Sequence, residues 1–175
     1  MNKRDLSIPM KEATIKSLIL AAPIAIIQAY VFFQFHQLFE LPENENMLWF
    51  AFLLLAGIFM HELIHMIAWA MFAGKPLNTF KLGFLWTALT PYAHCKEPMG
   101  IRPYRIGSLA PGLLLGIIPW FASLFNGNVL LFFFGLAYTS AAGGDFLILW
   151  WLRNVKPKTL VEDHPSNAGC YVYEE

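Results

Sequence analysis

Charged residues are scarce in this chain. Asp, Glu, Lys and Arg make up only 14% of its 175 residues, whereas soluble domains carry about a quarter. So few charges cannot coat a water-facing surface of this size, but lipid can surround the apolar remainder. Hydrophobic residues make up 57% of the sequence, and its 16 Phe and 6 Trp crowd into the apolar runs. The composition indicates an integral membrane protein and argues against the alternative, a very apolar soluble bundle.

Cysteine and net charge are also minimal. Cys95 and Cys170 are too few and too far apart in the sequence to form a disulfide framework. The formal net charge is zero, so nothing favours broad electrostatic attraction of a polyanion. We therefore expect a lipid bilayer around the protein and no nucleic-acid partner.

Four apolar stretches are each long enough to cross a bilayer, which takes about 20 residues. They run over residues 17–35, 47–73, 106–125 and 129–152. The expected fold class is therefore an all-α integral membrane protein with four transmembrane helices. No small-residue cleavage pattern ends the first stretch, so we interpret it as a retained span and not a signal peptide. We expect one membrane domain over residues 1–153 and a short, solvated cytoplasmic tail over residues 154–175.

Lysine and arginine alternate between the segments that separate these stretches. The loops at 36–46 and 126–128 have none, and the other three segments hold all of them. The positive residues are Lys3, Arg4, Lys11 and Lys16 before the first stretch, Lys75, Lys81, Lys96, Arg102 and Arg105 in the middle loop, and Arg153, Lys156 and Lys158 in the tail. Because positive loops stay inside, we predict a multi-pass protein of the cell membrane with both termini in the cytoplasm, where both cysteines stay reduced.

The middle loop, residues 74–105, is too polar to span, but its centre at 82–89 is apolar and suits strands. Two interpretations stay open. It is either a short β-hairpin at membrane depth, which requires other protein to satisfy its backbone, or an interfacial loop.

Ionisable residues inside a span are costly and mark functional sites. Within the four stretches they are only His61, Glu62, His65 and Asp145. His61 and His65 are four residues apart, so on a helix both imidazoles point from one face and can hold one metal ion. Glu62 is placed to take a proton from a metal-bound water, which zinc acidifies while it polarises the carbonyl under attack. A chance five-letter match is the alternative, disfavoured because the span has no other ionisable residue.

Catalytic zinc usually takes three protein ligands, and Asp145 is the candidate third. His65 precedes Lys75 by ten residues and Asp145 precedes Arg153 by eight, so at about 1.5 Å per residue both lie at the same depth within one turn. We expect Gly143 and Gly144 to let the fourth span approach the second closely. In the alternative, Asp145 only pairs with a polar group in the bundle.

The chain lacks the residues that two other kinds of metal site require. A di-iron bundle needs two Glu-x-x-His elements, and the chain has one; membrane desaturases use several histidine boxes, and only two histidines lie within the stretches. His94 and Cys95 in the middle loop are either ordinary loop residues, which we favour, or a fourth, inhibitory ligand. The last residues of the tail suit a strand, which is the alternative to a solvated end and would lie over the cleft of the site.

His61-Glu62-Leu63-Ile64-His65 in one span and Gly144-Asp145 in a later one resemble the site-2 protease group of intramembrane metalloproteases. With the loop residues at 95–98, Cys-Lys-Glu-Pro, the chain from about Met47 to Gly169 is more similar still to a small family of bacterial membrane zincin peptidases. The resemblance implies zinc ligands at His61, His65 and Asp145 and a catalytic base at Glu62. It departs from site-2 proteases where Phe146 replaces their usual glycine, and it lacks their PDZ domain.

These observations predict a zinc-dependent intramembrane endopeptidase that cuts a membrane protein or membrane-associated peptide with a Glu-activated, zinc-bound water. The competing hypothesis is a non-catalytic zinc-binding membrane protein, a sensor or a scaffold. A transporter is a third, but four spans with one closed cluster offer no pathway. Glu62 favours hydrolysis, because a binding-only site has little use for a carboxylate that is not a ligand.

Overall fold

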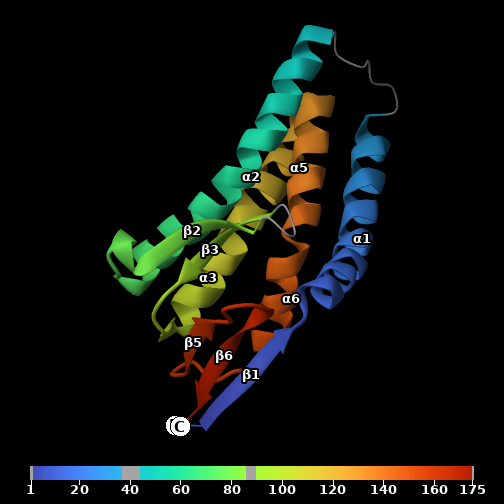
Figure 1. Ribbon diagram of the computed structural model, residues 1–175. Helices are drawn as coiled ribbons and strands as arrows, with labels where there is room; N and C mark the ends of the chain where they lie inside the picture. The colour runs from blue at the N-terminus through green and yellow to red at the C-terminus, as the bar shows by residue number, and fades with distance from the viewer. Residues whose placement is uncertain (1, 37–43, 86–89, 175) are drawn as a thin grey trace.

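A bundle of apolar helices occupies one end of the protein and a small β-sheet the other, in a computed structural model that describes residues 2–36, 44–85 and 90–174. Figure 1 shows α1 beside α5, with both termini at the sheet end. The elements in chain order are β1 (Asn2–Ile8), α1 (Met10–Phe35), α2 (Asn44–Ala73), η1 (Leu77–Thr79), β2 (Phe80–Leu85), β3 (Thr90–Cys95), β4 (Met99–Gly100), α3 (Ile101–Pro111), η2 (Gly112–Ile117), α4 (Ile118–Asn126), α5 (Val129–Ala141), α6 (Gly143–Leu152), β5 (Leu160–Asp163) and β6 (Ala168–Glu174).

Three to four helical segments are long and apolar enough to cross a membrane, as in a multi-pass membrane protein. Three are continuous, over Met10–Phe35, Met47–Ala73 and Ile101–Asn126. The fourth joins α5 to α6 with a bend of 44°. The predicted apolar stretches fall inside these helices, although the first and third helices begin earlier than expected because their polar first turns continue the helix.

Apolar side chains on the outer faces of these helices are open to the surroundings. Ile19 of α1 is 68% exposed, and Leu48 and Phe59 of α2 are 75% and 62% exposed. In water such faces would be sites of association, but hydrocarbon solvates them without penalty. The outward faces therefore fit the predicted lipid environment.

Inside the bundle, α1 is joined to α5 by ring stacking and by one polar contact. Phe32 stacks on Phe132 with ring centroids 4.1 Å apart. The buried amide of Gln28 donates through Nε2 to the Thr139 hydroxyl at 3.0 Å. Interhelical hydrogen bonds of this kind join membrane helices where lipid offers no hydrophobic drive.

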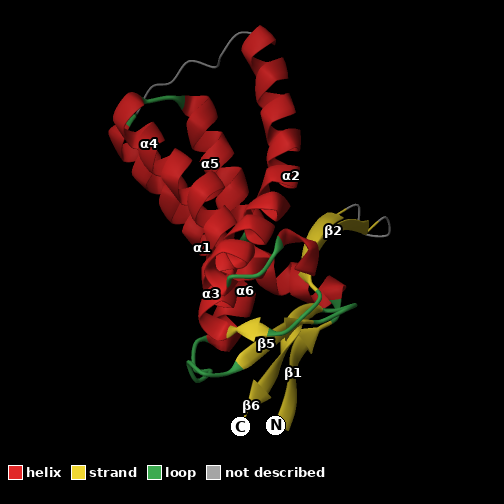
Figure 2. Ribbon diagram, turned by 90° about the vertical axis from the view of Figure 1, so that its left-hand side faces the viewer, coloured by secondary structure: helices red, strands yellow, loops and turns green. Residues whose placement is uncertain are grey.

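The prediction of a helical membrane protein is confirmed in its main part, but the fold is not all-α and the tail is not a solvated end. Both ends of the chain enter a four-stranded sheet of order β1-β6-β5-β4, drawn at the bottom of Figure 2. β1 and β6 are antiparallel from Asn2↔Glu174 to Ile8↔Ala168. The sheet forms because alternate residues of the tail, Val161, Cys170 and Val172, are apolar and become fully buried.

The middle loop contains a β-hairpin. β2 and β3 pair antiparallel from Phe80↔Cys95 to Leu85↔Thr90; residues 86–89 of the predicted segment lie outside the described residues. Phe80 stacks near Trp69 of α2, with centroids 6.4 Å apart. The main hydrophobic core lies where hairpin, helix ends and sheet meet, and it includes Trp69, Phe80, Tyr104, Leu152, Val161 and Val172.

A substitution at Gly135 tests the close packing of α5 against η2 and α4. A Cβ at this position would lie 2.4 Å from the Trp120 nitrogen and 2.7 Å from the Gly116 oxygen. Both are backbone atoms that cannot swing aside, so we expect Gly135→Ala to destabilise the bundle by about 1–3 kcal/mol. Thermal unfolding in detergent measures the loss. Gly144→Ala is the matched control, since a Cβ there meets no atom within 4 Å; equal melting of the two variants would contradict the packing.

Candidate metal centre

Two histidines of α2 turn their rings toward each other. His61 and His65 are separated by one helical turn, which places both imidazoles on one face. Their Nε2 atoms lie 3.2 Å apart, and both side chains are buried, with His61 8% and His65 4% exposed. Two neutral imidazoles at this distance present two lone pairs to one point.

Asp145 joins the two histidines from the other side of the bundle. Its Oδ2 lies 3.1 Å from the Nε2 of His61, and its Oδ1 lies 3.2 Å from the Nε2 of His65. The break at Ala142 gives α6 its own first turn, which contains Asp145. Because a helix N-terminus carries partial positive charge, this turn favours the ionised carboxylate. The structure thus brings together three of the four predicted residues as a group that could hold a metal ion.

The spacing of these ligand atoms fits zinc. A tetrahedral zinc site with bonds of about 2.0–2.1 Å separates its ligand atoms by about 3.3–3.4 Å, close to the 3.2 Å between the two Nε2 atoms. The Asp145 carboxylate brings Oδ2 to 3.1 Å from the Nε2 of His61 and Oδ1 to 3.2 Å from the Nε2 of His65. The other ring nitrogen of His65, Nδ1, lies 2.9 Å from the Gly107 carbonyl oxygen. When Nδ1 carries the proton and donates to that oxygen, Nε2 is left as the ligand. Donor type, spacing and tautomer therefore agree.

The ring of His65 is held from behind by aromatic packing. Trp69 stacks on it with centroids 5.1 Å apart and planes 17° apart. The indole Nε1 of Trp69 donates to the Tyr104 carbonyl at 3.1 Å. α3 can approach this closely because position 107 is glycine, where a Cβ would lie 2.0 Å from the Trp69 ring. Outer contacts of this kind fix the orientation of a metal ligand.

Glu62 lies beside the cluster and is not part of it. Its Oε2 accepts a hydrogen bond from the Ala93 backbone N–H of β3 at 2.6 Å. The hairpin therefore holds this carboxylate beside the group of three ligands. A carboxylate in this place is suited to accept a proton.

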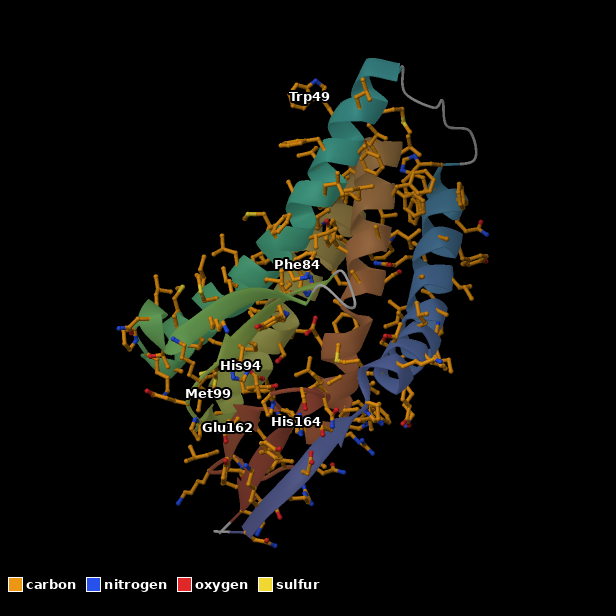
Figure 3. The ribbon with its side chains drawn as sticks, viewed as in Figure 1. Trp49, Phe84, His94, Met99, Glu162 and His164 are labelled. Atoms are coloured by element: carbon orange, nitrogen blue, oxygen red, sulfur yellow. The ribbon has the colours of Figure 1, made fainter. Side chains whose placement is uncertain are left out.

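The candidate ligands and Glu62 line one cavity of about 570 Å³. β3 lines another part of it, and so do residues 164–169, which form the turn between β5 and β6 and the first two residues of β6. His164 organises this turn, since its Nδ1 accepts from the backbone N–H groups of Ser166 and Asn167 at 3.2 and 2.8 Å. Figure 3 shows His94 of β3 and His164 in the same region between helices and sheet. The terminal strands thus line the cleft, which agrees with the alternative prediction that the tail adds a strand over the site.

Gly143 and Gly144 do not bring α6 against α2 as expected. A Cβ at Gly143 would lie 2.7 Å from the Ser17 carbonyl oxygen of α1, and Gly144 has open space beside it. The close approach at Gly143 is therefore to the first span. Gly144 instead lines the cavity next to Asp145.

His94 and Cys95 lie outside the cluster formed by the described residues. His94 lines the cavity, with Nδ1 3.8 Å from Oδ2 of Asp163. The Cys95 thiol donates to the Glu97 carbonyl at 3.0 Å. Burial raises the pKa of the Cys95 thiol, and burial followed by the charge of Asp163 raises the pKa of Cys170 to about 12. Both are free, buried thiols.

Sequence reasoning missed Asp163, a buried carboxylate beside this site. It accepts hydrogen bonds from Tyr104 Oη at 2.7 Å and from the Cys95 backbone N–H at 2.9 Å. Burial raises its pKa, and these hydrogen bonds oppose the rise. The one signal in the sequence is an acidic residue that ends a short strand-forming segment in the tail, which is too common a pattern to mark a site.

Comparison with known proteins agrees with this geometry. No curated protein and no solved structure matches the chain. Residues 54–160 match the family described as "Putative zincin peptidase", and this range contains the two histidines, Glu62, the hairpin and Asp145. With more than half of its length matched, the chain belongs to this family.

Proposed function

We propose that the protein is a zinc-dependent intramembrane endopeptidase. One observation carries the proposal: three side chains whose candidate ligand atoms lie within 4.8 Å of one another share a cavity with a carboxylate outside that group. His61, His65 and Asp145 would hold the zinc ion. When bound, zinc supplies a Lewis acid for the scissile carbonyl and acidifies the attacking water.

Glu62 is the proposed general base. It accepts the proton of the attacking water and delivers it to the leaving amine, the two roles that one carboxylate can fill in succession. Its hydrogen bond from the Ala93 N–H fixes the carboxylate in the cavity. A site that only bound metal would have no need for this second, fixed carboxylate.

The proposed substrate is a segment of a membrane protein or a membrane-associated peptide in extended form. A helical substrate must unwind locally, because its carbonyls are already hydrogen-bonded. The edge of β3 that faces away from β2 borders the cavity. An added strand would bond to the backbone carbonyls of this edge, because the N–H groups of Ala93 and Cys95 are already bonded to Glu62 and Asp163. The cavity of about 570 Å³ is large enough for several side chains.

The proposed place of cleavage is the cytoplasmic half of the cell membrane. Lys and Arg of the N-terminal segment, the middle loop and the tail support cytoplasmic termini. The four site residues lie in the halves of α2 and α5–α6 nearer the sheet, which both termini enter. The hairpin and the terminal sheet would then meet substrate at the cytoplasmic surface.

Substitution of Glu62 separates hydrolysis from metal binding. Glu62→Gln keeps the shape of the side chain but cannot accept the proton, so we expect kcat to fall about 10²- to 10⁴-fold while bound zinc is unchanged. Cleavage of single-span peptides by purified protein, together with zinc content, measures both. Glu12→Gln on the exposed first turn of α1 is the control. Zinc binding without cleavage by the wild type would instead support the sensor or scaffold.

Substitution of Asp145 tests the third ligand. Asp145→Ala removes one of three proposed ligands. Loss of an outer contact lowers metal affinity about 10- to 100-fold, and loss of a ligand should lower zinc affinity by more than this. Competition with a chelator measures the affinity, with the exposed Asp5→Ala as control. Undiminished affinity would show that Asp145 is not a ligand.

A further inference from the structure

Two carboxylates accept hydrogen bonds from the edge of β3 that faces the cavity. β3 pairs with β2 along its other edge, and in an antiparallel pair alternate residues turn their N–H groups to opposite edges. Ala93 and Cys95 are two residues apart, and their N–H groups bond to Glu62 Oε2 at 2.6 Å and to Asp163 Oδ2 at 2.9 Å. Pro91, two residues earlier, has no N–H. The same strand edge thus donates one hydrogen bond to Glu62 of α2 and one to Asp163 of β5.

Asp163 is itself fixed on three sides. Its Oδ1 accepts from the buried Tyr104 hydroxyl at 2.7 Å, and its backbone pairs with Cys170 of β6. The side chain is 13% exposed. The backbone carbonyl of Tyr104 accepts from Trp69, whose ring stacks on His65. Asp163 is therefore anchored to the same framework that orients the candidate zinc ligands.

We infer that Asp163 is a positioning residue that holds β3 in place so that the Ala93 N–H fixes the carboxylate of Glu62. The inference rests on the proposed function, in which Glu62 is the base. Glu62 projects from a helix on a side chain with three rotatable bonds, and a second contact is needed to fix its carboxylate. The position of the Ala93 N–H, which makes this contact, depends on the position of β3.

Removal of Asp163 would leave the buried Cys95 N–H without its acceptor. A buried donor that loses its partner draws the backbone toward a new one, and Ala93 lies two residues away on the same edge. The Ala93 N–H would then leave Glu62. Asp163 lies beyond residues 54–160, the part that the family matches, so the inference makes the terminal sheet part of the working site.

Amide exchange tests the inference without any assay of cleavage. In the full-length, zinc-loaded protein, Asp163→Ala should speed exchange at Cys95 and also at Ala93, by about 10- to 100-fold, as expected when a hydrogen bond to a charged group is lost. Glu162→Gln is the matched control on the same strand, because its carboxylate accepts from Tyr173 within the sheet. Faster exchange at Cys95 with Ala93 unchanged would overturn the inference.

Kinetics supply the second readout. Asp163→Ala should lower kcat about 10- to 100-fold, with KM and bound zinc unchanged, as for loss of an outer contact to a reacting group. If Asp163→Ala does not fold, Tyr104→Phe removes the anchor of Oδ1 and should raise exchange at the same two amides. Loss of zinc in place of kcat would overturn the inference. An inactive wild type would refute the proposed function alone, and the exchange experiment would still decide the role of Asp163.

Discussion

A carboxylate among membrane helices persists only beside groups that neutralise it, and this constraint organises the centre of the protein. Asp145 meets His61 and His65 at 3.1–3.2 Å, in the first turn of a helix whose N-terminus favours negative charge. α2 and α6 must come together at one depth for that contact to form. The bend of 44° between α5 and α6 lies just before Asp145, and α1 packs against this turn at Gly143.

Around this contact, three elements from different parts of the chain supply the surroundings of the site. α3 orients His65 through the Gly107 carbonyl and through Trp69. The hairpin holds Glu62, and residues of the terminal sheet line part of the cavity. The helices therefore supply the candidate metal ligands and Glu62, and the strands supply the surroundings of these groups.

The parts of the fold that depend on local composition could be predicted from the sequence. Long apolar runs give membrane helices whatever follows them, and the four-residue spacing of His61 and His65 needs only a helix to bring the rings together. Asp145 could be placed because depth in a bilayer can be counted from the flanking positive residues. The hairpin was one of two interpretations, since its apolar centre also suits an interfacial loop.

The terminal sheet could not be predicted in the same way. Its strands pair Asn2 with Glu174 and Leu6 with Cys170, and no local pattern shows that segments so far apart are neighbours. Asp163 was missed for the same reason, because it becomes a buried acceptor only when β5 lies against β3 and α3. Gly143 faces α1 and not α2 because the bend at Ala142 turns the first residues of α6, a feature that a straight-helix argument does not include.

The pairing of β1 with β6 also determines whether the chain crosses the membrane an even or an odd number of times. Strands that share hydrogen bonds over seven residue pairs must lie on the same side of a bilayer, so a chain that ends in both of them crosses it an even number of times. The helix lengths alone allow three or four crossings, and only four is even. The pairing of the terminal strands therefore favours the bent α5–α6 segment as a full crossing over a re-entrant loop, with the bend at Ala142, three residues before Asp145, along its path.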